Sequence, residues 1–297
     1  MNDRMETSVP DIYAAGDAVQ VKHYVTGNDA LISLAGPANK QGRIIADNIC
    51  GGDSRYLGSQ GSSVIKVFDM TATTTGINET NAKKSGLEVD TVILSPMSHA
   101  GYYPGGKVMT MKVVFEKETY RLLGAQIIGY EGVDKRIDVL ATAIHAGLKA
   151  TQLKDLDLAY TPPYSSAKDP VNMAGFMIDN IAKGTLKQWH LEDMDKISRD
   201  KSVVLLDVRT VGEFNRGHMD GFKNIPVDEL RERINEIEKG KPVYLICQSG
   251  LRSYIASRIL EGNGYETYNF SGGFRFYDAV VNDRALIEKA YACGMDY

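Results

Sequence analysis

The segment Cys247-Gln248-Ser249-Gly250-Leu251-Arg252 constrains the fold of this chain more than any other. It lies between an apolar run, residues 243–246, and a helix-like run, residues 253–260, that glycines end. This order predicts a strand that delivers Cys247 to a turn, and a helix that begins directly after the turn. Free N–H groups at the start of such a helix, with the charge of Arg252, favour a thiolate and hold an anionic sulfur species. The alternative is a small apolar cysteine that ends a buried strand.

Further motifs surround this segment in the C-terminal part of the chain. They are Leu206-Asp207-Val208-Arg209, Glu213-Phe214, Arg216-Gly217-His218, Gly221-Phe222, Asn224-Ile225-Pro226 and Ser271-Gly272-Gly273-Phe274. Together with the Cys247 segment they resemble the rhodanese family, whose cysteine carries a persulfide and passes its outer sulfur to a thiophilic acceptor.

The rhodanese resemblance implies a role for each residue of the segment. Cys247 is the expected sulfur carrier, and Arg252 the residue that stabilises its persulfide. The substrate sulfur is expected to bind the residues between them, Gln248, Ser249, Gly250 and Leu251. Asp207 and His218 are expected to be structural. The related tyrosine-phosphatase-like loops are one residue longer, so the smaller cradle favours sulfur over phosphate.

Composition limits the class of protein. The 297 residues, with 43% hydrophobic and 24% charged, are typical of a soluble globular protein of two or three domains. The net charge of −4 gives no reason to expect nucleic acid, and no apolar run reaches membrane-spanning length. No N-terminal signal segment is evident, and Cys50, Cys247 and Cys293 are too scattered for a disulfide framework or zinc site. We therefore expect a cytoplasmic protein, with Cys50 and Cys293 buried or inert.

Residues 11–18 form a short apolar run that ends in Gly16-Asp17-Ala18, which predicts a strand and then a close approach of backbone to ligand. Gly-Asp alone is also an ordinary turn signal. With residues 7–10 before it, the run resembles the second flavin motif of the pyridine nucleotide-disulfide oxidoreductases, in which the aspartate binds the ribityl hydroxyls of FAD. A helix should follow, with Pro37 in its first turn and glycines at its end.

The same resemblance shows what this sequence lacks. Members of that superfamily begin with a Gly-rich βαβ unit for FAD, carry a redox cysteine after it, and insert a second Gly-rich unit for NAD(P)H. No strand–GxGxxG–helix pattern occurs in this chain. We therefore expect it to be the C-terminal portion of a longer flavoenzyme and to purify without FAD.

The middle of the chain alternates between strand and helix patterns. Strands are predicted over residues 63–68, 108–115 and 122–129, and helices over residues 78–86 and 133–146. This order resembles the dimerisation domain that follows the flavin segment in the same superfamily, and it implies a homodimer.

Two segments within this region narrow the subfamily. At residues 159–170, Thr161-Pro162 stands where glutathione-reductase-like members carry the His-Pro of a dithiol mechanism. Together with the tyrosines here and at residues 98–106, this departure resembles the coenzyme A-disulfide reductase and NADH oxidase branch. That branch implies that Tyr102 and Tyr160 reach the partner subunit's active site and donate phenolic hydrogen bonds to the substrate sulfur. It also implies that Asn39 and Lys168 contact coenzyme A. Without the resemblance, we would interpret the tyrosines as loop-packing residues and Lys168 as a solvated helix start.

The sequence thus predicts a chain of mixed α/β and α+β class. Residues 1–58 would be the C-terminal piece of an FAD-binding domain, 59–175 an α+β dimerisation domain, 176–190 a linker, and 191–297 an α/β rhodanese domain with a parallel sheet. The parent enzyme would pass electrons from NAD(P)H through FAD to a coenzyme A disulfide, persulfide or polysulfide. The alternatives are an NADH oxidase, and a sulfurtransferase or dimerising module without redox turnover.

Overall fold

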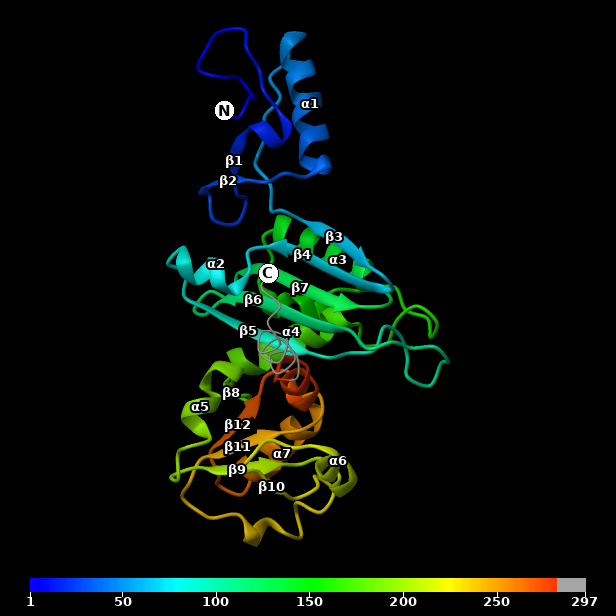
Figure 1. The fold of residues 1–297 in the computed structure, drawn as a ribbon, viewed down its shortest axis with the longest axis vertical. Helices are drawn as coiled ribbons and strands as arrows, with labels where there is room; N and C mark the ends of the chain where they lie inside the picture. Colours follow the sequence, from blue (N-terminus) through cyan, green and yellow to red (C-terminus); the bar gives the residue numbers. More distant parts are fainter. Residues whose placement is uncertain (282–297) are drawn as a thin grey trace, which may run out of the picture. The chain divides into compact units, whose positions relative to one another are not determined.

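The computed structural model describes residues 1–281, so Cys293 lies outside the described residues. Two compact units make up the described chain. The first contains residues 1–91 and 112–150, and the second contains residues 92–111 and those from 151 onward. Figure 1 shows the elements of each unit.

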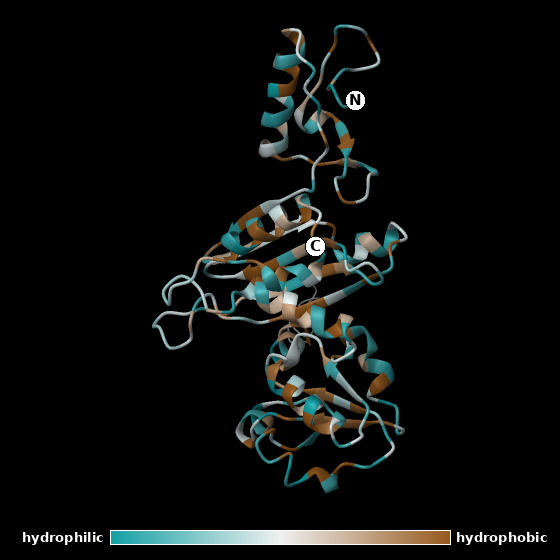
Figure 2. Cartoon of the chain, turned by 180° about the vertical axis from the view of Figure 1, so that it is seen from behind, coloured by the Kyte–Doolittle hydropathy of each residue, from teal (hydrophilic) through white to brown (hydrophobic). Residues whose placement is uncertain are grey.

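The first residues form a small hairpin and a helix. Strands β1 (Gln20–Lys22) and β2 (Asp29–Leu31) pair antiparallel, and helix α1 (Ala35–Ile49) follows with Pro37 in its first turn, as predicted. Hydrophobic and hydrophilic residues alternate along α1 in Figure 2, and its Ile44 and Ile45 pack against Met5, Val19 and Val21.

The predicted strand at residues 11–18 is wrong. Tyr13 makes only an isolated bridge, and Gly16–Ala18 is a 3₁₀ turn, η1. The physical reason lies in the backbone, because Asp11 has φ +62° and Gly16 has φ +77°. Residues in the left-handed region interrupt an extended chain.

The middle sheet has the strand order β3-β4-β7-β6-β5. Its strands are β3 (Ser63–Val67), β4 (Met70–Gly76), β5 (Val89–Leu94), β6 (Thr110–Glu116) and β7 (Leu122–Gly129), with helices α2 (Glu79–Lys84) and α3 (Val133–His145). Three of these strands and both helices were predicted from the sequence. Strands β4 and β5 were not predicted. Strand β4 is mostly threonine, so it lacks the apolar alternation that marks a half-buried strand. Helix α3 packs its apolar face on β4 and β7.

The C-terminal sheet is entirely parallel, with the order β10-β9-β11-β12-β8, which confirms the predicted α/β class. Its strands are β8 (Gln188–Trp189), β9 (Val204–Asp207), β10 (Lys223–Asn224), β11 (Val243–Ile246) and β12 (Thr267–Phe270). The helices are α4 (Pro170–Ala182), α5 (Met194–Ile197), α6 (Val211–Arg216) and α7 (Leu251–Glu261), with 3₁₀ turns η2 (Ala150–Asp155), η3 (Leu191–Asp193) and η4 (Ile234–Glu236).

The residues predicted as a linker, 176–190, include the end of α4 and strand β8. Helix α4 runs through residue 175 without a break, because Val171, Ala174 and Ile178 give it a buried face. Strand β8 then pairs with β12 at the edge of the parallel sheet. The domain limits given by the sequence stay predictions.

Apolar clusters cover both faces of the parallel sheet, as such a sheet requires. Leu206, Val243 and Leu245 belong to one cluster, and their neighbours Leu205 and Ile246 belong to the other. This alternation follows the two-residue period of a strand. Among residues 1–281, no helix has the length and apolar character needed to cross a bilayer.

Candidate functional site

The fold delivers Cys247 as the sequence predicts. Strand β11 ends at Ile246, and α7 begins at Leu251, so the thiol lies at the strand–helix junction. Gly250 precedes the helix with φ +101°, a conformation that lets the chain turn sharply without strain from a side chain. We call residues 247–252 the thiol loop.

Two donors point at the sulfur atom of the thiol loop. Cys247 Sγ accepts hydrogen bonds from the backbone N–H of Gly250 at 3.1 Å and from Ser253 Oγ at 3.2 Å. Ser253 Oγ also lies near Gly250 O, but that carbonyl already accepts from Tyr254 N and Asn269 Nδ2, so the hydroxyl proton is available to the sulfur. Hydrogen bonds to a charged acceptor are roughly twice as strong as to a neutral one, so this arrangement favours a thiolate or persulfide.

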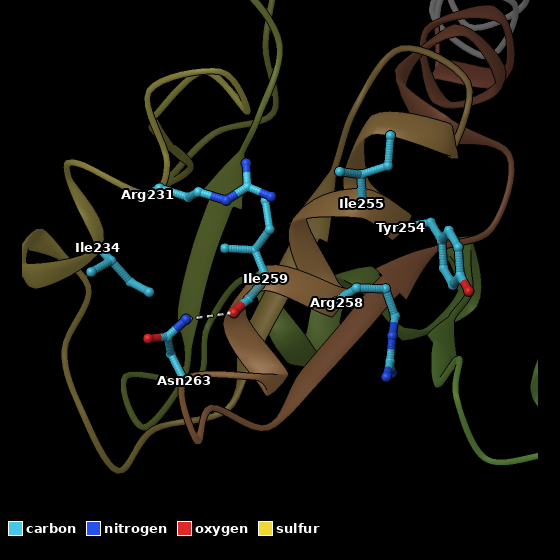
Figure 3. Close-up of a pocket in the computed structure, with 7 residues that line it drawn as sticks. All are labelled: Arg231, Ile234, Tyr254, Ile255, Arg258, Ile259 and Asn263. Carbon is cyan, nitrogen blue, oxygen red and sulfur yellow. Dashed lines mark hydrogen bonds between the residues drawn. The ribbon is translucent and has the colours of Figure 1, made fainter.

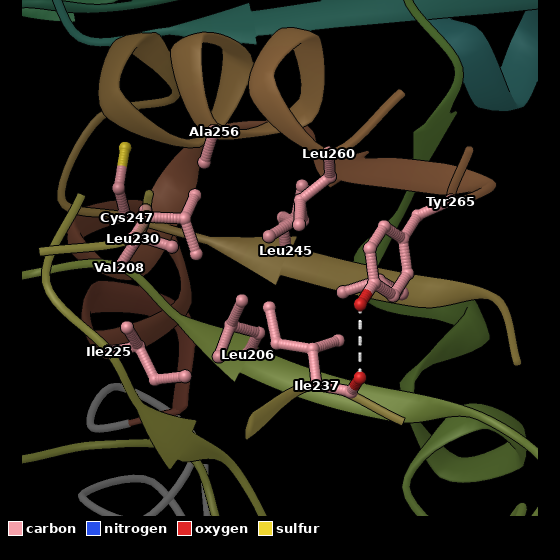
Figure 4. Packing of buried hydrophobic residues seen from close by; sticks show 11 residues of the cluster. Leu206, Val208, Ile225, Leu230, Ile237, Leu245, Cys247, Ala256, Leu260 and Tyr265 are labelled. Atoms are coloured by element: carbon pink, nitrogen blue, oxygen red, sulfur yellow. Dashed lines mark hydrogen bonds between the residues drawn. The ribbon is translucent and has the colours of Figure 1, made fainter. Parts of the chain in front are cut away.

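The thiol itself is buried. Cys247 is 1% exposed and lies at the edge of the apolar cluster that contains Val208 and Leu230 (Figure 4). The apolar surroundings that the alternative interpretation expects are therefore present, together with the two donors. Ser253 was not predicted as a site residue, and its position in the first turn of α7 was the available signal.

Arg252 is held by a carboxylate that sequence reasoning did not assign to the site. Its guanidinium donates two hydrogen bonds of 2.7 Å to Glu213, one to each oxygen. Glu213 also accepts from Thr210 in a capping box at the start of α6. The Arg252 hydrogen bonds lower the pKa of Glu213 to about 2, against the opposing effect of burial.

The same bond raises the pKa of Arg252, which Cys247 raises further by electrostatic attraction. Glu213 therefore binds the guanidinium directly, whereas Cys247 acts on it only through its charge. The Thr210-x-x-Glu213 spacing was the available signal for the capping box, but not for the ion pair.

A buried ion pair contacts the thiol loop, because Arg209 Nη1 lies 3.5 Å from Gln248 Oε1. Arg209 and Asp207 are 1% and 0% exposed, and Arg209 Nη2 lies 2.7 Å from Asp207 Oδ2. The Arg209 guanidinium also stacks on the Phe274 ring at 3.8 Å. His218 stacks on Phe214 at 3.9 Å between ring centroids. Both Asp207 and His218 thus make the structural contacts expected of them.

The structure brings the two predicted tyrosines together. Tyr102 Oη and Tyr160 Oη are 2.7 Å apart, and both side chains are exposed. This hydrogen bond raises the pKa of Tyr160 above its ordinary value. One of the pair's two phenolic protons makes the mutual bond, and the other remains for a ligand. The adjacent Tyr103 instead packs edge-on against His99.

Backbone contacts hold the two tyrosine-bearing loops to each other. Ala100 N donates to Ser165 O at 2.9 Å, and Ser165 Oγ donates to Asp169 at 2.6 Å. Asp169 in turn caps α4 by accepting from Val171 N. The two loops that carry the tyrosines are therefore tied to each other and to the N-terminus of α4.

The residues expected at the flavin lie at the 3₁₀ turn η1. Gly16 N donates to Gln41 Oε1 at 2.8 Å, which fixes the turn against α1. Asp17 and Ala18 are exposed, and the Asp17 carboxylate has no hydrogen-bond partner among the described residues. A free carboxylate on a fixed turn fits the hydroxyl chain of a flavin.

The residues expected at coenzyme A belong to different units. Asn39 lies in α1, where its amide donates to Ala35 O, and Lys168 is exposed just before α4.

Cys50 was expected to be either buried or inert, and the structure shows that its side chain is exposed. Within residues 1–281, no cluster of His, Cys, Asp and Glu has the arrangement of a metal site.

Comparison with known proteins identifies both domains. Residues 62–170 match the dimerisation domain of the pyridine nucleotide-disulphide oxidoreductases, and residues 190–279 match the rhodanese-like domain. This chain joins a domain of each family. It is 39% identical over 170 residues to the NAD(P)H sulfur oxidoreductase (CoA-dependent) of Pyrococcus abyssi, a match that covers 57% of this chain and 38% of the relative.

Two solved structures resemble nearly the whole chain. Reduced CoADR-RHD of Bacillus anthracis is 46% identical with a TM-score of 0.92, over 96% of this chain and 51% of that one. The NAD-dependent persulfide reductase of A. fulgidus is 41% identical with a TM-score of 0.85, over 93% of this chain and 50% of that one. The chain thus spans about half the length of these structures.

Proposed function

We propose that this chain supplies the sulfur-carrying and dimer-forming part of a flavin-dependent reductase of coenzyme A disulfides, persulfides or polysulfides. The observation that carries the proposal is the thiol loop, where two donors converge on Cys247 Sγ in a domain of rhodanese type. Relatives that extend over both domains include a persulfide reductase, which supports a sulfur substrate.

The sulfur-transfer step uses Cys247 as nucleophile. The thiolate attacks the outer sulfur of a donor R–S–SH, a new S–S bond forms, and the donor's S–S bond breaks. The products are the anionic cysteine persulfide and R–SH, and the donor's proton ends on the departing thiol. The Gly250 N–H and the Ser253 hydroxyl stabilise the anion before and after transfer, because both donors already face the sulfur. Gln248, Ser249 and Leu251 complete the cradle, and Arg252 adds its charge.

The redox part of the proposal rests on the first unit and the tyrosine pair. FAD, when bound, would carry electrons from NAD(P)H to the sulfur substrate. Gly16, Asp17 and Ala18 would hold its ribityl chain, and Asn39 and Lys168 would contact coenzyme A. In a homodimer, Tyr102 and Tyr160 would serve the partner's site, with the spare phenolic proton donated to the substrate sulfur. A cytoplasmic location stays a prediction.

Sulfur transfer by the purified chain tests the proposal. We expect Cys247→Ser to abolish thiosulfate:cyanide sulfurtransfer and to prevent the mass increase of a persulfide. Cys50→Ser is the matched control, because Cys50 is an exposed thiol at the end of α1, and it should keep wild-type activity. Undiminished transfer by Cys247→Ser would contradict the sulfur-carrier role. In the full-length enzyme, oxygen consumption that is independent of any coenzyme A disulfide would favour the oxidase alternative.

A further inference from the structure

A cavity of about 520 Å³ lies beside the thiol loop. Its charged walls come from Arg209, from α6 and from the segment that follows β12. They are formed by Arg209, Glu213, Arg216, Arg275 and Asp278, with Gln248 of the thiol loop between them.

Most of the charges in this cavity are already paired, but two guanidinium groups are not. Glu213 is bound by Arg252, and Arg209 is bound by Asp207. Arg216 and Arg275 have no side-chain hydrogen bond or ion pair with any residue of the described chain. Guanidinium groups are the side chains that best match carboxylates and phosphates, because they bind both oxygens at once. Arg216 and Arg275 are therefore available to bind an oxyanion in the cavity.

The cavity wall is fixed to the thiol loop through the backbone. Phe274 N donates to Cys247 O at 2.8 Å, and Arg275 N donates to Gln248 O at 3.2 Å. Gly273 allows this contact, since a Cβ there would lie 2.7 Å from Gln248 O. A group bound by Arg275 is thus held in register with the residue that follows the reactive cysteine.

We propose that Arg216 and Arg275 form a binding site for the oxyanion group of the thiol that brings sulfur to Cys247 or takes it away. The inference rests on the proposed sulfur-carrier function and names the substrate class: low-molecular-weight thiols that carry a carboxylate or a phosphate. Such a thiol places its sulfur at the thiol loop and its anionic group between the two guanidinium groups. An uncharged thiol gains nothing from the cavity.

Kinetics with three persulfide donors test this site in the full chain. Glutathione persulfide carries carboxylates, coenzyme A persulfide carries phosphates, and 2-mercaptoethanol persulfide carries no further charge. We expect Arg216→Gln and Arg275→Gln each to raise the KM of a charged donor about tenfold, with kcat within about twofold and the uncharged donor unchanged. A rise confined to glutathione persulfide identifies carboxylates, and a rise confined to coenzyme A persulfide identifies phosphates.

Arg231→Gln is the matched control. Arg231 is another exposed arginine of the same domain without an ion pair in the described chain, and it lines a separate cavity with Ile234 and Ile259 (Figure 3). It should leave every KM unchanged. Charged-donor KM values of the Arg216→Gln, Arg275→Gln double variant within about twofold of wild type would overturn the site. An equal rise for the uncharged donor would overturn it too.

Binding without chemistry separates this inference from the sulfur-carrier proposal. Calorimetry with Cys247→Ser measures the affinity for glutathione and coenzyme A when no sulfur is transferred. We expect at least one to bind, and the double arginine substitution to weaken that binding about tenfold or more. If the wild-type protein transfers sulfur from none of the donors, arginine-dependent binding would support the cavity site and refute the sulfur carrier. Sulfur transfer by the wild-type protein, without arginine-dependent binding, would support the sulfur carrier and refute the cavity site.

Discussion

Replacing Glu213 by Gln removes the charge that pairs with Arg252 and keeps the size of the side chain. Arg252 lowers the pKa of Glu213 from 4.5 to about 2. Since one pKa unit corresponds to about 1.4 kcal/mol, this shift implies a contribution of about 3 kcal/mol to the stability of the domain. The Glu213 side chain is 20% exposed, so solvent screens the interaction only in part.

The sign of the pH dependence follows from the lowered pKa. A carboxylate whose pKa is depressed by folding stabilises the protein fully above its unfolded value, 4.5, and loses that effect as pH falls towards about 2. We therefore expect Glu213→Gln to cost about 2–3 kcal/mol at neutral pH. The difference from wild type should shrink steadily below about pH 4.5.

The sequence contains a single tryptophan, which makes this domain easy to follow. Trp189 is 2% exposed in a cluster on one face of the parallel sheet, so its fluorescence reports unfolding of the rhodanese-like domain alone. Urea titrations of wild type and variant from about pH 7 to about pH 3 give the free energy difference at each pH.

Glu236→Gln is the matched control for this measurement. Arg233 lowers the pKa of Glu236 also to about 2, but that side chain is 40% exposed and the pair lies in solvent. Its loss should cost far less than the loss of Glu213. Equal costs for the two substitutions, or a Glu213→Gln difference that does not change with pH, would refute the reasoning.

Three further changes test the site. Ser253→Ala should slow alkylation of Cys247 by iodoacetamide several-fold, because a hydrogen-bond donor to the thiolate is lost. Ser257→Ala is the control, because Ser257 is also buried in α7, and it should leave the alkylation rate unchanged. Intact mass measures the alkylation of both variants. Gly273→Ala should destabilise the domain by more than about 1 kcal/mol in the same fluorescence titration, because its φ is +68° and its Cβ would strike the thiol loop. Tyr102→Phe should lower the pKa of Tyr160 towards its ordinary value, as read by NMR of labelled tyrosine; an unchanged pKa would mean that the phenols do not bond in solution.

Local patterns predicted the elements whose apolar residues recur at a fixed period. The strand before Cys247 and the helix after it were placed from sequence, and so were α3 and three strands of the middle sheet. Strand β4 was not predicted, because its threonines give no alternation of apolar and polar residues. Its place in the sheet is set by pairing with β3 and β7. The start of the chain failed for the opposite reason, since its apolar residues suggested a strand that left-handed residues prevent.

Some contacts of the site are set by residues near in sequence and could be predicted, whereas others depend on residues far apart in sequence. The donors to the sulfur, Gly250 and Ser253, follow Cys247 by three and six residues, so one turn and one helix start place them. Glu213 lies 39 residues before Arg252, and no local pattern indicates that they meet. The local motif therefore fixes where the thiol lies, while the distant carboxylate holds the guanidinium of Arg252. A loop of the same sequence that lacked a carboxylate at this place would present a freer cation to the same thiol, so the motif alone does not determine its reactivity.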